Sequence, residues 1–330
     1  MSRGIAVALF AVTALVVQAP SAAADVCGRQ VVGDILAKYE QMGGETSLLG
    51  CPTTDELPTP DGRGRYNHFE GGSIYWTPTT GAHPVWGAVR DKWASMGWEA
   101  SKLGYPVGDE LTNPDGQGKR QQFEGGTVYW HPTLSNGAHP VWGQIGKLWG
   151  EWGWEGGNFG YPTSDEIPSP ELKGFIQTFS THRTVLWWST GFDNGDTNHP
   201  VCKEECVGYK AAIGSEWVKA TEVARNLVNG NVDISVFPTE EGFESADTSY
   251  DRLWNQSFSK VPYPDRWLSD DQGSSLYKQL ACHARYSYDL GGGPLSGDTW
   301  DLEGWAPDVS WDYAMNPIFF LDHGCNWYER

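Results

Sequence analysis

The stretch Phe69-Glu-Gly-Gly-Ser-Ile-Tyr-Trp76 occurs again, almost unchanged, as Phe123-Glu-Gly-Gly-Thr-Val-Tyr-Trp130. Each copy alternates apolar with small or polar residues around a Gly-Gly pair, which predicts a β-hairpin or a tight pair of strands. The same tail follows each copy, Gly81-Ala-His-Pro-Val-Trp86 and Gly137-Ala-His-Pro-Val-Trp142. Long copies in the same order indicate a repeat protein.

A shorter motif lies upstream of each copy: Leu49-Gly-Cys-Pro52, Leu103-Gly-Tyr-Pro106 and a degenerate Phe159-Gly-Tyr-Pro162. Its glycines are 54 and then 56 residues apart. This near-constant spacing predicts small units that bury their apolar faces against one another. We therefore predict an α+β fold, with about three short helix-plus-β-hairpin repeats in propeller-like or solenoid-like packing and then a small disulfide-bonded α+β domain.

Each unit is predicted to begin with a short helix, at Ile35–Gly43, Val89–Gly97 and Ile145–Gly153. Apolar residues fall at i, i+4 and i+7 in all three, which places them on one helical face. The terminal Gly suits the left-handed residue that ends a helix. Three aromatic residues on these faces are predicted to be core: Tyr39, Trp93 and Trp149.

These signatures, together with the Asp-Glu pairs and the Asp-Gly turns between them, resemble the LGFP repeat. The resemblance covers roughly Ile35 to Pro200. That family occurs in secreted envelope proteins of actinobacteria, often beside a mycolyltransferase, esterase or amidase domain. The resemblance implies attachment to, or recognition of, cell-wall polysaccharide.

Two kinds of polar residue recur with the repeat. The pairs that follow the Leu-Gly-x-Pro motif are Asp55-Glu56, Asp109-Glu110 and Asp165-Glu166. They are interpreted as turn acceptors, with binding of a cation or a sugar hydroxyl as the alternative. The histidines before Pro are His83, His139 and His199. They either hold the connection to the next unit or contact a ligand or metal. The third unit departs from the pattern at Phe179-Ser-Thr-His182, as terminal repeats commonly do.

Met1 to Ala24 has the layout of a secretory signal peptide, with Arg3, an apolar run and a small-residue end. The apolar run is shorter than the ~20 residues that cross a bilayer. We expect a secreted protein, extracellular or associated with the cell wall, that is not membrane-embedded. The net charge of −19 becomes −20 without Arg3, which disfavours nucleic acid and anionic membranes as partners.

All six cysteines lie beyond the leader: Cys27, Cys51, Cys202, Cys206, Cys282 and Cys325. An even count in an exported chain predicts disulfides, although spacing alone leaves 15 connectivities open. Domain logic favours pairing Cys27 with Cys51 and Cys282 with Cys325, which leaves Cys202 with Cys206. A zinc site at Cys202 and Cys206 lacks a second ligand pair. We expect no metal and no cofactor.

The repeat pattern ends near Val207. Helices are predicted at 216–228 and 274–288, and a strand at 232–237. This region resembles an uncharacterised family of exported actinobacterial proteins. The predicted organisation is a signal peptide (1–24), a repeat domain (25–201, with units at about 35–87, 88–143 and 144–201), a cysteine-containing junction (202–206) and a C-terminal domain (207–330).

No catalytic signature stands out in the chain. It has no Gly-x-Ser-x-Gly elbow. Weak catalytic candidates are His283, His323 and Asp322. An acidic run could instead hold Ca²⁺ or form a solvated surface: Asp298, Asp301, Glu303, Asp308 and Asp312.

The sequence favours a non-catalytic envelope protein whose repeats bind an arabinogalactan-like polysaccharide. The alternative is a wall-targeted hydrolase with its active site in the C-terminal domain. Aromatic residues can be core or can stack on sugar rings. The predicted ligand-binding residues are Trp76, Trp130, Trp188, Tyr75, Tyr129, His83 and His139.

Overall fold

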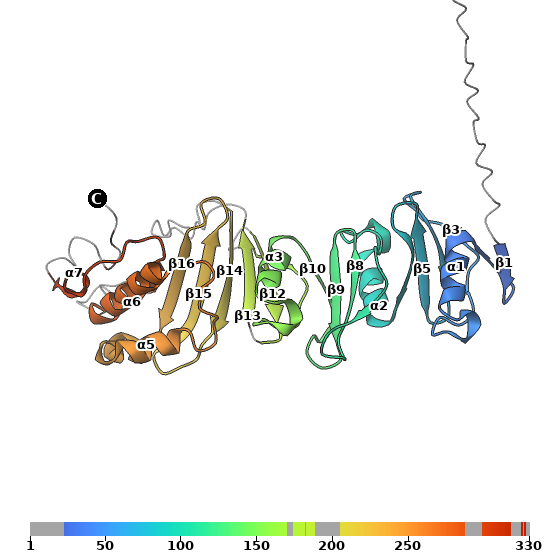
Figure 1. Ribbon diagram of the computed structural model, residues 1–330. Coiled ribbons are helices and arrows are strands. Elements are labelled where there is room, and N and C mark those ends of the chain that lie inside the picture. Colours follow the sequence, from blue (N-terminus) through green and yellow to red (C-terminus); the bar gives the residue numbers. More distant parts are fainter. Residues whose placement is uncertain are drawn as a thin grey trace, which may run out of the picture. The chain divides into compact units, whose positions relative to one another are not determined.

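The computed structural model describes residues 23–169, 174–181, 183–188, 205–287, 299–317, 325 and 327. The chain divides into two compact units, Met1–Pro84 and Val85–Arg330. Both mix helices with small antiparallel sheets, and the strands of the described residues close no barrel (Figure 1). The mixed α and β composition is thus confirmed, while propeller-like or solenoid-like packing stays a prediction.

The first unit opens with a two-stranded hairpin, β1 (Ala23–Val26) and β2 (Arg29–Val32), followed by helix α1 (Gly33–Gln41). Its four-stranded sheet has the order β3 (Leu57–Pro58), β4 (Arg65–His68), β5 (Gly72–Thr77) and β6 (Gly81–Trp86). Helix α1 packs against β5, so each helix belongs with the sheet that follows it.

The second unit repeats this order. Helix α2 (Gly87–Met96) precedes a sheet of β7 (Leu111–Thr112), β8 (Lys119–Phe123), β9 (Gly126–His131) and β10 (Gly137–Val141). Helix α3 (Gly143–Glu151) then begins the next copy. The three repeat helices were predicted within two residues of their observed bounds, because apolar spacing and the terminal glycine mark them clearly.

The glycine carbonyl of the Leu-Gly-x-Pro motif ties each helix to its sheet. The aromatic side chain at the centre of the helix donates to that carbonyl in every copy. The bonds are Tyr39 Oη to Gly50 O (2.9 Å), Trp93 Nε1 to Gly104 O (3.1 Å) and Trp149 Nε1 to Gly160 O (3.0 Å). All three aromatic residues are buried, as predicted.

The Phe-Glu-Gly-Gly motif fixes its β-hairpin to the Leu-Gly-x-Pro motif. The Glu124 carboxylate accepts the backbone N–H of Tyr105 at 3.1 Å. A Cβ placed on Gly125 would lie 1.9 Å from the Lys102 carbonyl oxygen. The glycine therefore allows a close approach of the chain to itself. In the third copy Ser180 Oγ replaces the glutamate as acceptor, at 3.0 Å from the backbone nitrogen of Tyr161.

In the first repeat, the residues that follow α1 reach back to the β1–β2 hairpin. Asp55 and Glu56 accept the backbone N–H groups of Gln30 (3.0 Å) and Val32 (3.1 Å). Cys51 stands where the other copies carry tyrosine, and it forms the predicted disulfide with Cys27. Two hydrogen bonds and a disulfide thus fix the hairpin to the first repeat.

Removing this disulfide should destabilise the first unit. The bridge joins residues 24 apart, and closing a loop of that size stabilises a fold by about 3 kcal/mol. We expect the double variant Cys27→Ser, Cys51→Ser to lower the first unit's unfolding free energy by about this amount. Denaturation monitored by hydrogen exchange at α1 measures it, with α6 as the internal control. Unchanged protection of α1 would mean that the disulfide does not stabilise the first unit.

Asp165 makes the matching link between the second and third repeats. Its carboxylate oxygens lie 2.8 Å from His139 Nδ1 and 2.8 Å from Lys92 Nζ. Tyr161, from the third Leu-Gly-x-Pro motif, donates its hydroxyl to Asp115 in the preceding repeat. Asp165 and Tyr161 therefore connect the third repeat to the second.

This link should depend on pH. The hydrogen bond from His139, with Lys92 adding to it, holds the pKa of Asp165 below its ordinary value, although burial opposes the shift. A depressed carboxyl pKa contributes stability above the unfolded pKa of about 3.9, and this is lost as the pH falls through the folded value. Urea denaturation should show the stability gap between wild type and Asp165→Asn shrinking below about pH 4. A gap that stays constant with pH would contradict the link.

The third repeat runs into the C-terminal region as one seven-stranded sheet. Its order is β11 (Ile167–Ser169), β12 (Gly174–Phe179), β13 (Arg183–Trp188), β14 (Cys206–Ala212), β15 (Val218–Asn226), β16 (Val232–Pro238) and β17 (Trp300–Glu303). Strand β14 pairs with β13 at six positions and also contacts α3. The junction predicted at 202–206 therefore ends inside β14, at Cys206, and residues 202–204 lie outside the described part of the chain.

Among the described residues of the C-terminal region there are four α-helices: α4 (Glu240–Ser245), α5 (Tyr250–Ser257), α6 (Asp270–Arg285) and α7 (Trp311–Met315). Helix α5 packs on β15, and α6 packs on β17 (Figure 1). One buried core extends from Tyr129 and Trp149 in the repeats to Trp300 and Leu302 in β17. The second disulfide, Cys282–Cys325, is also as predicted. Cys202 lies outside the described residues, so its pairing with Cys206 stays a prediction.

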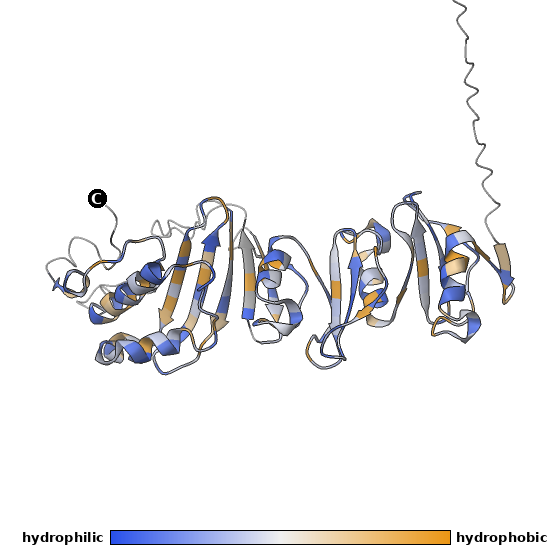
Figure 2. Ribbon diagram, in the orientation of Figure 1, coloured by the Kyte–Doolittle hydropathy of each residue, from blue (hydrophilic) through white to orange (hydrophobic). Residues whose placement is uncertain are grey.

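The helix predicted at 216–228 is wrong. These residues form β15, which pairs with β14 on one side and β16 on the other. The register of β15 shifts between Val218 and Ala220. Its buried residues fall at 218, 221, 223, 224 and 226, so the strict alternation that would identify a strand is lost. Figure 2 shows hydrophobic and hydrophilic residues mixed along this part of the sheet. The strand at 232–237 and the second helix are confirmed, although α6 begins at Asp270, where Ser269 is the N-cap and Gln272 completes a capping box.

Candidate functional site

A cleft of about 640 Å³ lies in the second unit, between the β7–β10 sheet and the short 3₁₀ turn Trp154–Gly156 that follows α3. This volume falls within the range of ordinary ligand pockets. The sheet supplies Arg120, Gln122, Thr127 and Tyr129, and the turn supplies Trp154 and Glu155.

Strand alternation explains how the four sheet residues come together. Side chains two residues apart share a face of a strand. Arg120 and Gln122 therefore share one face of β8, and Thr127 and Tyr129 share one face of β9. The register pairs Arg120 with Tyr129 and Gln122 with Thr127. The result is a two-by-two array of hydrogen-bonding side chains on the wall of the cleft.

The cleft is lined by one cation, Arg120, and two carboxylates, Asp109 and Glu155. Arg120 Nη1 lies 3.6 Å from Glu155 Oε1, whose side chain is only 9% exposed. Arg120 also donates to the side-chain oxygen of Asn113. Burial, with Glu155 adding to it and Arg120 opposing it, raises the pKa of Tyr129 to about 12. The Tyr129 hydroxyl is thus protonated at neutral pH and can both donate and accept a hydrogen bond.

Trp154 is the exposed aromatic residue of the cleft. Its side chain is 51% exposed, and one edge meets Trp149 with ring centroids 5.6 Å apart. Its backbone has φ +58°, a left-handed conformation that costs a non-glycine residue roughly 1–2 kcal/mol. The first repeat carries Gly44 at this position, with φ +59°. Strain kept at a tryptophan where glycine would fit points to a functional role.

This strain can be measured through two substitutions at one position. Both Trp154→Ala and Trp154→Gly remove the ring, but only glycine adopts a positive φ without a Cβ clash. We expect the glycine variant to be more stable than the alanine variant by about 1 kcal/mol, the reverse of the usual order in regular structure. Urea denaturation of the two variants makes the comparison. An alanine variant as stable as the glycine variant, or more stable, would mean that the backbone at residue 154 is not strained.

The predicted aromatic ligands divide between the two faces of their sheets. Tyr129 lines the cleft, so Trp130, the next residue, points to the opposite face. Trp76 likewise points away from Tyr75, packs against the first unit's core and donates its indole N–H to Asp34 at 2.7 Å. Tyr75 is buried.

Trp188 is described only by its backbone in β13. The third hairpin has one residue more than the other two, because Phe179 pairs with Arg183 whereas Phe123 pairs with Gly126. The pairing therefore aligns Trp187, rather than Trp188, with Trp130.

The predicted histidines lie in connections between elements. His83 Nε2 is 2.9 Å from the Thr80 carbonyl oxygen, within the same turn. His139 Nδ1 is 2.8 Å from Asp165, in the link between repeats. His199 lies outside the described residues. His83 and His139 thus both bond groups of the chain itself. Neither of them lines the cleft.

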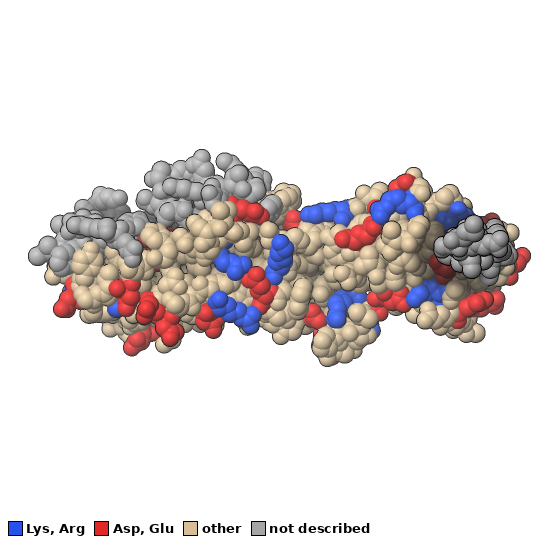
Figure 3. Space-filling model, turned by 45° about the horizontal axis from the view of Figure 1, so that its top comes forward, with Lys and Arg blue, Asp and Glu red and all other residues tan. Residues whose placement is uncertain are grey.

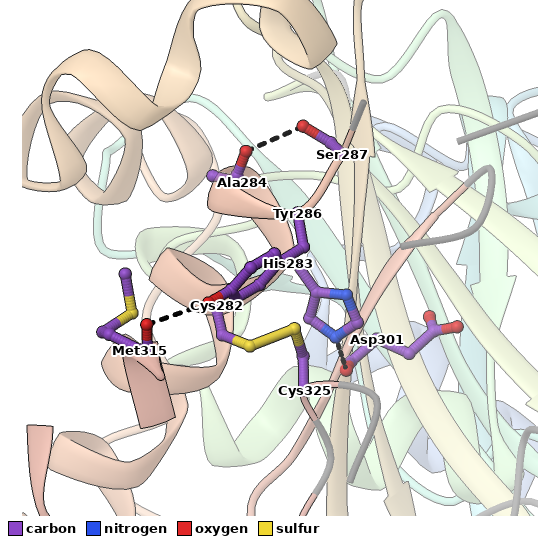
Figure 4. The surroundings of a disulfide bond; sticks show 8 residues. All are labelled: Cys282, His283, Ala284, Tyr286, Ser287, Asp301, Met315 and Cys325. Atoms are coloured by element: carbon purple, nitrogen blue, oxygen red, sulfur yellow. Dashed lines mark hydrogen bonds between the residues drawn. A yellow bond between two sulfur atoms is a disulfide. The ribbon is translucent and has the colours of Figure 1, made fainter. Parts of the chain in front are cut away.

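Of the weak catalytic candidates, only His283 lies in the part of the chain that the structure describes. It is buried on α6, and its Nε2 is 3.1 Å from the backbone oxygen of Asp301, beside the Cys282–Cys325 disulfide (Figure 4). The Asp301 side chain extends away from the ring (Figure 4). Asp322 and His323 lie outside the described residues.

Sequence reasoning missed Arg120, Gln122, Trp154 and Glu155. One signal was present: Gly153-Trp154-Glu155 and Gly97-Trp98-Glu99 correspond to Gly43-Gly44-Glu45 in the first repeat. Trp98 also has a positive φ of +56°. In two copies a tryptophan with a positive φ takes the first position of the 3₁₀ turn, where the first repeat has Gly44.

The LGFP repeat family model matches residues 49–101 and 103–157. The chain thus contains two LGFP repeats, which is consistent with a repeat-containing cell-surface protein. The matched frame begins at the Leu-Gly-x-Pro motif, whereas in the fold each helix packs on the sheet after it. No curated protein matches the chain. No helix among the described residues is long and apolar enough to cross a membrane.

Proposed function

We propose that this protein is an exported cell-envelope protein whose repeats bind cell-wall polysaccharide in the Trp154 cleft. The observation that carries the proposal is the half-exposed Trp154 ring, held by a strained backbone beside a wall of hydrogen-bonding side chains. The apolar face of a sugar ring stacks on an aromatic ring. Its hydroxyl groups would bond Tyr129, Gln122 and Thr127.

The electrostatics support an uncharged glycan of the arabinogalactan type. Arg120 is already paired with Glu155. Its positive charge is therefore not free to bind an anionic polymer. The chain's charge of −19 also repels polyanions. Two disulfides support an oxidising location outside the cytoplasm. The C-terminal region is then the part that the repeats hold at the wall.

A matched pair of variants tests the proposal. Trp154→Ala removes the ring in the cleft, and Trp130→Ala removes a ring on the opposite face of the sheet. Binding of purified wall polysaccharide would be measured by isothermal titration calorimetry. We expect Trp154→Ala to weaken binding at least tenfold, the equivalent of about 1.4 kcal/mol, and Trp130→Ala to change it little. Loss of binding only in Trp130→Ala would place the site on the opposite face.

A hydrolase is the alternative. Its only described candidate, His283, has its Nε2 on a backbone carbonyl, so no geometry here favours that reading over glycan binding.

A further inference from the structure

A second group of partly exposed aromatic side chains lies far from the cleft, on the helices of the C-terminal region. Ring centroids are 5.4 Å apart for Trp254 and Tyr277, 6.1 Å for Tyr277 and Trp311, and 5.9 Å for Tyr250 and Trp311. Helices α5, α6 and α7 each contribute to this row, which we call the aromatic ladder. Trp311, at the outer end of the aromatic ladder, is 40% exposed.

Carboxylates flank the aromatic ladder. Asp251, beside Tyr250, accepts the Tyr277 hydroxyl hydrogen bond at 2.7 Å. Asp312 is exposed beside Trp311, and Asp308 is exposed near Lys278. Across residues 240–287 and 299–317 there are twelve Asp and Glu against five Lys and Arg. Figure 3 shows acidic side chains gathered over this helical end.

The three cations on α5 and α6 are already engaged, and the first of them, Arg252, pairs with Glu216. Lys278 Nζ lies 2.7 Å from Asp308 Oδ1 and 2.8 Å from the Val309 carbonyl oxygen. Arg285 donates hydrogen bonds to the side-chain oxygens of Tyr250 and Tyr286. The face therefore presents tryptophan and tyrosine rings beside acidic groups. Rings of this kind attract a guanidinium or ammonium group through their faces, and the nearby carboxylates add to that attraction.

We propose that the aromatic ladder docks a basic, arginine- or lysine-rich segment of a partner protein. A cationic side chain of that segment lies over the Trp311 ring and between Asp251 and Asp312. Charge complementarity selects this occupant over a neutral sugar chain, because stacking of sugars needs the rings but not the surplus of carboxylates. The proposal does not depend on glycan binding in the Trp154 cleft.

The test uses the full chain and a capped octapeptide of alternating arginine and glycine, with a citrulline-for-arginine peptide as the uncharged control. Calorimetry at low salt should show binding of the arginine peptide only. Trp311→Ala, which leaves the protein's charge unchanged, should weaken it about tenfold, and Trp311→Phe should restore part of the loss. Asp312→Asn should weaken it as well, and added salt should do the same. Trp154→Ala is the matched control and should bind as wild type does.

Three outcomes overturn the proposal. Equal binding by wild type and Trp311→Ala would reduce the effect to non-specific attraction by an acidic protein. Equal binding of the citrulline peptide would remove the role of charge. Trp311-dependent binding of neutral wall polysaccharide, without binding of the arginine peptide, would make the aromatic ladder a glycan platform. Retained thermal stability of Trp311→Phe separates each result from misfolding.

Discussion

A chain that ends at Trp188 is expected to lose the fold of its third repeat. Strand β14 supplies the fourth strand of that repeat, and Tyr209 on β14 packs against Trp152 and Phe159 with ring centroids 5.6 and 5.5 Å away. Without β14, strand β13 becomes an unpaired edge, and the core around Trp149 and Val185 opens to water. Hydrogen exchange of residues 23–188 should show β12 and β13 unprotected.

The control for this truncation keeps every strand but breaks the chain. Residues 23–330 with a protease site inserted between Trp188 and Glu205 would be cleaved after folding. The two fragments should stay together and β13 should keep its protection, because strand pairing rather than the covalent link holds the sheet. If residues 23–188 protect β13 as well as the full chain does, the third repeat folds by itself and the continuous core is not required.

Replacing Trp149 by alanine should cause the largest loss of stability of any single substitution considered. The side chain is fully buried, and its ring meets Tyr129 at 4.7 Å and Phe179 at 5.6 Å between centroids. Truncating a buried tryptophan costs about 3–5 kcal/mol. The change also leaves the Gly160 carbonyl without its indole donor. Chemical denaturation should show a lower midpoint, and binding in the cleft should weaken because Trp149 supports both Tyr129 and Trp154.

Two control variants show how large the effect of Trp149→Ala is. Trp311→Ala removes the same side chain from an exposed position and should cost about 1 kcal/mol or less. Trp149→Phe keeps most of the buried area and should recover much of the loss. An effect of Trp149→Ala no larger than that of Trp311→Ala would mean that the inter-repeat core is not a main source of stability.

Local patterns predicted much of the repeat fold. The apolar spacing of Ile145, Trp149 and Trp152, with Gly153 after them, specifies a helix and its end, and the hairpin motifs specify strands. The disulfide from Cys27 to Cys51 followed from domain logic, which pairs the N-terminal cysteine with the one in the first repeat. These features depend on residues close together in the chain or on direct comparison of copies.

What could not be predicted depends on pairing between distant segments. β15 carries residues compatible with a helical face, and only its neighbours β14 and β16 make it a strand. The completion of the third repeat by Cys206–Ala212 is likewise a tertiary event. The cleft joins Arg120 in one repeat to Glu155 in the next. In the sequence, the positive φ of Trp154 is indicated only by the glycine that the first repeat has at the same position.

The most direct test of glycan binding is a titration of the protein's tryptophan indole N–H signals with a purified oligosaccharide from wall polysaccharide, followed by NMR. Substitution of Trp154 and Trp130 by phenylalanine assigns the two signals. We expect the Trp154 signal to shift progressively and saturate, while the Trp130 and Trp76 signals stay in place. Shifts confined to Trp130 and Trp76, with Trp154 unmoved, would contradict it.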